Sequence, residues 1–223
     1  MIKYVIIVAG GSGKRMNSDI PKQFLEINHI PVLMHTINCF LNADNSYQIR
    51  IVLPQEEIDR WTGICHKKGY QISGQLIPGG ETRFHSVKNG IDGIESDSLV
   101  AIHDGVRPLV SEEVIKRCFS LANTYEAVIP VWDIRESLRK IEGLSNKHVD
   151  RAMFKIIQTP QVFQGNVILK AYQQNYSPRF TDDASVVESI GYSIHLTEGN
   201  RENIKITDAF DLKIATYLLS AME

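Results

Sequence analysis

A glycine-rich loop that directly follows a buried strand constrains this chain more than any other stretch. Residues 4–8 (YVIIV) are apolar and rich in β-branched side chains, which is typical of a short strand buried on both faces. Three glycines follow within residues 10–13 (GGSG), so the backbone can turn sharply and direct its N–H groups at an anion. Cationic side chains lie close by in the sequence, namely Lys14, Arg15 and Lys22. The stretch predicts a phosphate-binding loop, with a plain glycine turn carrying solvated charges as the alternative.

Two commoner phosphate motifs do not fit this loop. The dinucleotide fingerprint G-x-G-x-x-G begins at Gly11 and Gly13, but Met16 stands where its third glycine should be. In the P-loop pattern G-x-x-x-x-G-K-[ST], Val8 would replace the first glycine and Arg15 the magnesium-binding hydroxyl. Nicotinamide-dependent chemistry and P-loop hydrolysis are therefore disfavoured.

Composition narrows the class of protein further. The 223 residues are 43% hydrophobic and 22% charged, which suits one globular domain. The formal net charge of -2 provides no general basic field, so we expect no nucleic-acid or membrane partner. The longest apolar run is too short to span a bilayer or to act as a signal peptide, which predicts a cytoplasmic protein. Cys39, Cys65 and Cys118 lie too far apart for a C-x-x-C motif, so neither disulfides nor structural zinc are expected.

Strand and helix patterns alternate along most of the chain. Apolar runs typical of strands follow the first one at residues 49–53, 75–77, 99–102, 127–131 and 192–196. Helical patterns lie at residues 32–41, 55–68, 84–94, 112–124, 166–174 and 181–191. A last helix is expected after Thr207 and Asp208, which can cap it, and its apolar stripe consists of Phe210, Ile214, Tyr217 and Leu218. The alternation predicts an α/β fold, a Rossmann-like, mostly parallel sheet with helices on both faces. Its ligand should lie at the carboxyl ends of the strands.

Two further loops at predicted strand ends carry polar groups. In residues 79–86 (GGETRFHS), Ser86 falls in the first turn of a helix, where its hydroxyl could read the edge of a pyrimidine base or cap the helix. In residues 103–108 (HDGVRP), Asp104 follows a buried strand and is a candidate ligand for a hard cation, or else a turn aspartate. His103 is expected to be packed at the strand end, and Arg107 to form an ion pair or to contact a substrate.

Residues 132–157 differ in character from the rest. Charged runs at residues 136–142 and 148–156 flank a turn at residues 143–146, which predicts a hairpin with too few apolar residues for a core of its own. We expect this arm to project and to pack on a second copy of the chain, with packing on its own domain as the alternative.

Short motifs occur in one order across nearly the whole chain. They are A-G-G-x-G-x-R-M, P-K-Q, G-G-x-x-R-x-x-S-V, H-D-x-x-R-P, V-D-R, T-P-Q, T-D-D-A-S and E-G-x-x-x-N-I-K-x-T. This ordered set resembles the 2-C-methyl-D-erythritol 4-phosphate cytidylyltransferase family of non-mevalonate isoprenoid biosynthesis. The resemblance implies a single domain of the nucleotide-diphospho-sugar transferase type over residues 1–223, and a homodimer joined by the arm. It also implies CTP as donor, a polyol phosphate as acceptor and Mg²⁺ as cofactor.

The same resemblance implies roles for individual residues. It gives Arg15 and Lys22 a role in stabilising the transition state, and Lys205 a role at the α-phosphate of CTP. It assigns eight residues to the CTP site, namely Ala9, Gly10, Gly11, Gly13, Gly80, Glu81, Ser86 and Asp104. Asp104 is also the acid that the family associates with the metal ion. It assigns the acceptor to Arg107, Thr159, Ser137 and Arg151, with Arg151 donated by the partner's arm. One departure is visible: the family's P-V-x-D-T segment reads P-V-W-D-I here, which shifts the hydroxyl role to Ser137.

Two other functions stay open at this point. A ribitol 5-phosphate cytidylyltransferase would share the CTP half of the site, although V-D-R and T-D-D-A-S favour the methylerythritol enzyme. A non-catalytic nucleotide-binding regulator would be expected to lack Arg15, Lys22 or Asp104, and all three are present.

Overall fold

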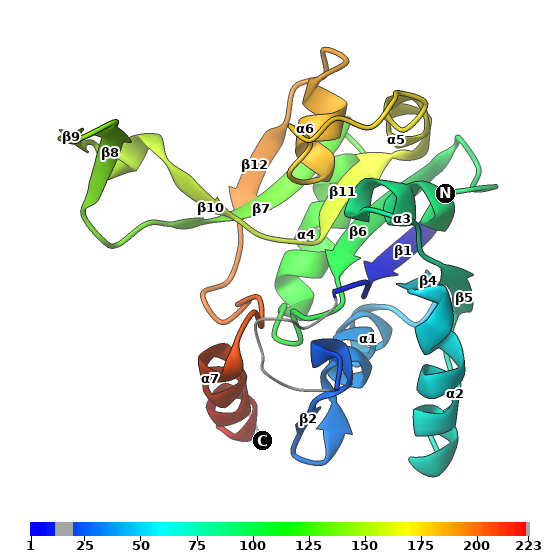
Figure 1. The fold of residues 1–223 in the computed structure, drawn as a ribbon. Coiled ribbons are helices and arrows are strands. Elements are labelled where there is room, and N and C mark those ends of the chain that lie inside the picture. The colour runs from blue at the N-terminus through cyan, green and yellow to red at the C-terminus, as the bar shows by residue number, and fades with distance from the viewer. Residues whose placement is uncertain (12–19, 222–223) are drawn as a thin grey trace.

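The computed structural model describes residues 1–11 and 20–221, and its centre is an eight-stranded, mostly parallel sheet (Figure 1). Its strands are β1 (Ile2–Val8), β4 (Gln48–Leu53), β5 (Gln75–Pro78), β6 (Ser98–Asp104), β7 (Ala127–Asp133), β10 (Lys155–Ile157), β11 (Gln161–Gln164) and β12 (His195–Glu198). They lie in the order β10-β7-β11-β6-β1-β4-β5, with β12 paired to β7. The pairs β1–β4, β1–β6, β4–β5 and β7–β12 are parallel, whereas β10 and β11 pair antiparallel with their neighbours.

Helices cover both faces of this sheet. On one face lie α1 (Val32–Ala43), α2 (Ile58–Lys67) and α4 (Glu112–Ala122); on the other lie α3 (Arg83–Gly90), α5 (Gly165–Ala171) and α6 (Asp183–Glu188). Side chains of β1 alternate between the two cores, with Val5 and Ile7 in the first and Tyr4 and Ile6 in the second. Both faces are buried, which explains why this strand is an unbroken apolar run. The predicted α/β architecture is confirmed. No helix in the described ranges is long and apolar enough to cross a membrane.

Several predicted elements have different bounds, among them a helix and a strand. The helix expected at residues 55–68 is a short 3₁₀ turn, Gln55–Glu57, followed by α2. The strand expected at residues 192–196 is β12, which begins at His195 and ends at Glu198. Its position is set by backbone pairing with β7, from His195 opposite Val128 to Glu198 opposite Val131. The apolar run gave no information about that register.

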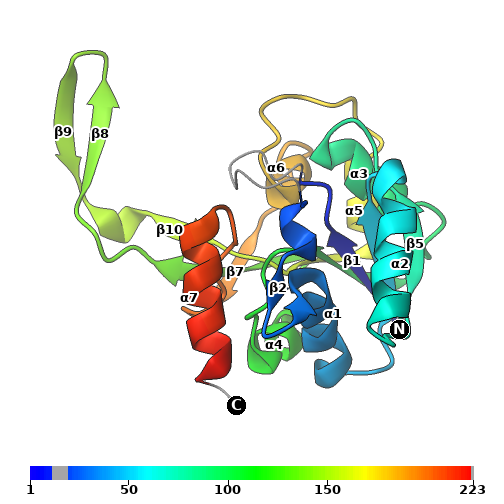
Figure 2. The same cartoon turned by 60° about the horizontal axis from the view of Figure 1, so that its bottom comes forward.

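The arm is a two-stranded hairpin that projects from the sheet (Figure 2). It consists of β8 (Leu138–Glu142) and β9 (Ser145–Val149), joined through Gly143, whose φ of 62° is a left-handed conformation that favours glycine. The single second strand predicted at residues 148–156 is wrong. After β9 the chain forms a 3₁₀ turn, Arg151–Met153, and returns to the main sheet as β10.

The last helix, α7 (Ala209–Ser220), packs through Leu218 of the predicted stripe, but two other residues of that stripe stay exposed. Phe210 and Tyr217 of the predicted stripe are 68% and 74% exposed. The buried residue is Ala215, which packs in a small core with Ile27 and Ile206. Ile27 belongs to a short strand pair, β2 (Glu26–Ile27) and β3 (Ile30–Pro31), so the tertiary contact decides which part of the helix surface is covered.

Trp61 is expected to be a main contributor to the stability of the first core. Its side chain is fully buried and stacks on Phe24, with ring centroids 5.7 Å apart. We expect Trp61→Ala to lower the free energy of unfolding by about 3–5 kcal/mol, because a large cavity replaces the indole. Urea denaturation followed by circular dichroism checks this, with Tyr217→Ala on the exposed face of α7 as the control. A loss below about 1 kcal/mol would contradict the prediction.

Candidate active site

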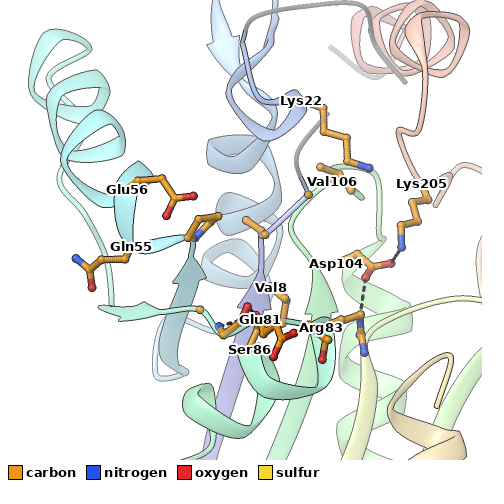
Figure 3. Close-up of a pocket in the computed structure, with 17 residues that line it drawn as sticks. Val8, Lys22, Gln55, Glu56, Glu81, Arg83, Ser86, Asp104, Val106 and Lys205 are labelled. Carbon is orange, nitrogen blue, oxygen red and sulfur yellow. Dashed lines mark hydrogen bonds and ion pairs between the residues drawn. The ribbon is translucent and has the colours of Figure 1, made fainter. Parts of the chain in front are cut away.

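A cavity of about 500 Å³ opens at the carboxyl ends of β1, β4, β5 and β6 (Figure 3). Parallel strands bring these ends to one edge of the sheet, so the loops that follow them meet there. The lining residues are Val8, Ala9, Gly10, Gly11, Lys22, Pro54, Gln55, Glu56, Gly79, Gly80, Glu81, Thr82, Arg83, Ser86, Asp104, Val106 and Lys205. The cavity lies at the edge where the alternating sequence pattern places a ligand.

The loop after β1 and Lys22 form one wall of the cavity. A Cβ atom on Gly11 would lie 2.9 Å from Cε of Lys22, so glycine leaves room for the lysine side chain. The Lys22 ammonium donates a hydrogen bond to the backbone oxygen of Ile206 at 3.2 Å. Ala9, Gly10 and Gly11, which the resemblance assigns to the CTP site, line the cavity. The other residues predicted for this loop, Gly13 and Arg15, fall within 12–19, outside the described residues.

The loop after β5 is fastened to the first turn of α3. The backbone N–H of Gly80 donates to the Ser86 hydroxyl at 3.1 Å. A Cβ on Gly80 would lie 2.5 Å from Cβ of His85, so this close approach requires glycine. The cap of α3 is Thr82, whose hydroxyl accepts from the backbone of His85. Ser86 is therefore not the helix cap, and its hydroxyl and Glu81 both line the cavity.

Asp104, at the end of β6, is surrounded by positive charge. Its Oδ2 atom lies 3.0 Å from Nε of Arg107 and 3.1 Å from Nζ of Lys205. Its Oδ1 atom lies 3.7 Å from Nε of Arg83. Burial opposes ionisation of this carboxyl, but the attraction of Arg83, Lys205 and Arg107 outweighs it and holds the pKa of Asp104 well below its usual range. Asp104 is therefore a carboxylate at neutral pH.

His103 lies behind Asp104 and is fully buried, as expected. Its ring nitrogens lie 2.9 Å from the Thr159 hydroxyl and 3.2 Å from the backbone oxygen of Arg107. Burial lowers the pKa of His103 to about 4, so the ring is neutral at neutral pH. Its contacts are structural, and it does not line the cavity.

Two predicted acceptor residues lie beside the cavity without lining it. Thr159 is 5% exposed, and its hydroxyl also accepts from the backbone N–H of Asp104 at 3.2 Å. Arg107 contacts Asp104 and donates to the backbone oxygen of Asn203 at 2.9 Å. Both residues therefore hold the Asp104 loop in place.

The two predicted acceptor residues of the arm do not reach this cavity within one chain. Ser137 is exposed. Arg151 donates to the backbone oxygen of Arg135 and lines a second cavity of about 550 Å³ at the base of the arm, together with Lys155. The arm leaves the sheet at the end of β7 and projects to the side, beyond β7 and β10 (Figures 1 and 2).

Sequence reasoning gave no role to Arg83 or Asp183, although both lie in the quoted motifs. Arg83 lines the cavity beside Asp104 and makes a bidentate contact with Asp183, at 2.9 and 2.6 Å. The signal was the presence of both residues in the ordered motif set, but their separation of 100 residues concealed the pair.

A Rossmann-like sheet whose carboxyl edge joins a glycine loop, fixed lysines and an ionised aspartate is the architecture of a nucleotidyltransferase. The sequence profile of the 2-C-methyl-D-erythritol 4-phosphate cytidylyltransferase family matches residues 3–221. The chain belongs to this family, and the resemblance noted from the motifs is confirmed.

Similar proteins span the same length. The 2-C-methyl-D-erythritol 4-phosphate cytidylyltransferase of Bacteroides thetaiotaomicron is 52% identical over 98% of this chain and 100% of its own, and that of Porphyromonas gingivalis is 46% identical over 98% of both. Among solved structures, the 4-diphosphocytidyl-2C-methyl-D-erythritol synthase of Anaerococcus prevotii superposes with a TM-score of 0.82, at 26% identity over 98% of both chains. These matches do not favour the ribitol phosphate alternative.

Proposed function

We propose that the protein transfers the cytidylyl group of CTP to 2-C-methyl-D-erythritol 4-phosphate. An oxygen of the acceptor phosphate attacks the α-phosphorus of CTP, the bond to the β-phosphate oxygen breaks, and pyrophosphate leaves. The products are 4-diphosphocytidyl-2-C-methyl-D-erythritol and pyrophosphate. The observation that carries the proposal is the cavity in which Lys22, Lys205 and Asp104 meet beside the loop after β1.

The residues of the site suit a reaction between two anions. The acceptor phosphate is already a nucleophile, so the reaction needs charge neutralisation and alignment more than a general base. In this proposal Lys22 and Arg15 stabilise the five-coordinate phosphorus, and Lys205 contacts the α-phosphate. The neutral, fully bonded ring of His103 supports a reaction without a general base at that position.

The donor set is compatible with Mg²⁺. The described residues contain no cluster of three or more His, Cys, Asp or Glu side chains that could hold a metal. Mg²⁺ at phosphate-transfer sites is commonly bound by one or two carboxylates together with substrate phosphates and water, which one ionised Asp104 can satisfy. When bound, the ion would neutralise charge on the triphosphate. Asp104 would hold it and Lys205 would remain beside the phosphates.

The nucleoside of CTP is proposed to lie between the loops after β1 and β5. Ala9, Gly10 and Gly11 expose backbone on one side, while Gly80, Glu81 and Ser86 line the other. The packing of Gly80 on His85 and the hydrogen bond from its N–H to the Ser86 hydroxyl hold this loop against α3, which supports a fixed surface for recognition of the base.

The acceptor is proposed to bind between two copies of the chain. Arg107 and Thr159 lie next to Asp104, whereas Arg151 and Ser137 lie on the projecting arm and do not reach that cavity in their own chain. A homodimer in which each arm enters the partner's site would complete the acceptor pocket. The cytoplasmic location expected from the sequence stays a prediction.

Pyrophosphate release tests the proposed reaction. The protein is incubated with CTP and Mg²⁺ and with either 2-C-methyl-D-erythritol 4-phosphate or ribitol 5-phosphate. We expect turnover with the first acceptor and at least about 100-fold less with the second, because unmatched polar groups of the acceptor would be left unpaired in the pocket. Turnover of ribitol 5-phosphate alone would overturn the acceptor assignment, and turnover of neither would favour a nucleotide-binding regulator.

A further inference from the structure

An ion pair between the partly buried Arg83 and the buried Asp183 lies beside Asp104. Asp183, at the start of α6, is fully buried. Its two carboxylate oxygens accept from Nη1 and Nη2 of Arg83 at 2.9 and 2.6 Å, and the hydroxyl of Tyr172 donates to Oδ1 at 2.6 Å. The proposed reaction uses none of these contacts.

Arg83 lies between two carboxylates that it contacts unequally. Its two terminal nitrogens form the fork on Asp183, whereas its Nε atom lies 3.7 Å from Oδ1 of Asp104, beyond hydrogen-bond distance. Figure 3 shows the Arg83 side chain next to Asp104 with a dashed line between them. The guanidinium is thus held mainly by Asp183.

The two carboxylate oxygens of Asp104 therefore differ in their contacts with cationic side chains. Oδ2 is engaged by Arg107 and Lys205 at 3.0 and 3.1 Å. For Oδ1, within residues 1–11 and 20–221, the structure gives the ion pair with Arg83 at 3.7 Å and no hydrogen bond. A cation that Asp104 holds would therefore use Oδ1.

The carboxylate of Asp183 neutralises the charge of Arg83 in an ion pair. Without that carboxylate, the guanidinium of Arg83, whose side chain is partly buried, would have Asp104 as its nearest negative partner and would be attracted to it. Arg83 needs to move less than 1 Å to form a direct hydrogen bond to Oδ1, judging from ordinary N–H···O distances of about 2.9 Å. It would then compete with a metal ion for that oxygen.

We propose that Asp183 is a positioning residue that restrains Arg83 and so keeps Oδ1 of Asp104 accessible to the divalent cation that accompanies the triphosphate. The inference rests on the proposed function. Removing the charge of Asp183 is expected to weaken cation binding, and removing Arg83 as well is expected to restore it. If Arg83 and Asp183 only stabilised the fold, removing both would not restore cation binding.

The test measures CTP binding by calorimetry at a series of Mg²⁺ concentrations, without acceptor, so that its readout is not activity. In Asp183→Asn the Mg²⁺ concentration for half-maximal enhancement of CTP binding should rise about tenfold or more. In the double variant Arg83→Gln with Asp183→Asn it should return to within about threefold of the original value. Tyr172→Phe, which removes the other contact of Asp183 but no charge, is the matched control and should leave the value unchanged.

The outcomes separate this inference from the proposed function. If the unmodified protein binds no CTP with or without Mg²⁺, the proposed function fails. If it binds CTP with Mg²⁺ and Asp183→Asn has the same Mg²⁺ dependence, the inference is wrong. Should Asp183→Asn not fold, as judged by circular dichroism, the double variant decides: a tenfold loss in it overturns the restraint, and a value near the original supports it.

Discussion

Lys205→Met should lower kcat/KM for cytidylyl transfer by about 100- to 1000-fold, the loss typical of removing one group that stabilises charge in a transition state. The ammonium of Lys205 lines the cavity and lies 3.1 Å from Oδ2 of Asp104. Methionine keeps much of the side-chain volume, so the loss of charge dominates. Because the lysine is proposed to act on the α-phosphate as charge develops, most of the loss should appear in kcat. Steady-state pyrophosphate release measures both constants.

Lys213→Met provides the matched control for this experiment. Lys213 carries the same side chain on exposed α7, does not line the cavity and should retain full activity. Thermal unfolding should show that both variants are folded. A loss of less than about threefold in Lys205→Met would exclude the proposed role, since a charge contact to a reacting phosphate is worth more than that.

Mixing two inactive variants should restore about a quarter of the activity, if each site takes residues from both chains. Asp104→Asn and Arg151→Ala are each expected to lose more than about 100-fold in kcat/KM as homodimers. After subunit exchange, half of the dimers are mixed, and each mixed dimer has one site with both changes and one with neither. Intact sites are then about one in four. The measurement is pyrophosphate release after co-refolding at equal concentrations.

A second mixture tests whether the regained activity comes from sites shared between two chains. Asp104→Asn and Lys205→Met change two residues that contact each other within one chain, so their mixture should regain no activity. Capture through a tag on one variant would establish that mixed dimers form in both cases. Mixed dimers of Asp104→Asn and Arg151→Ala that stay inactive would refute the donation of Arg151 by the partner's arm.

Much of the fold could be predicted from local pattern. The run at residues 4–8 predicted a strand buried on both faces, and Val5 and Ile6 do lie in opposite cores. The predictions were wrong where strand pairing or helix packing determines the bounds of an element or its buried side. The second run of the arm splits at Val149 because residues 155–157 return to pair with β7. Periodicity could not tell that Phe210 and Tyr217 of α7 would stay exposed while Leu218 of the same stripe packs on the small core.

For the candidate site too, some features could be predicted from the sequence and others depend on the tertiary structure. By itself the sequence determined the chemistry available: a glycine loop beside cations, an aspartate at a strand end, and the motif set that identifies the family. The glycine loop and the aspartate are local signals, because each lies within a few residues of a strand's carboxyl end, whereas the motif set extends over nearly the whole chain.

Only the tertiary structure decided how these groups act on one another. It brings Lys205 onto Asp104, places Thr159 behind that residue, and joins Arg83 to Asp183 across 100 positions. It also places Arg151 at a second cavity at the base of the arm and not at the cavity of Asp104 in its own chain. The reason is physical: charge interactions depend on distance and burial in three dimensions, and neither quantity can be obtained from the spacing of residues along the chain.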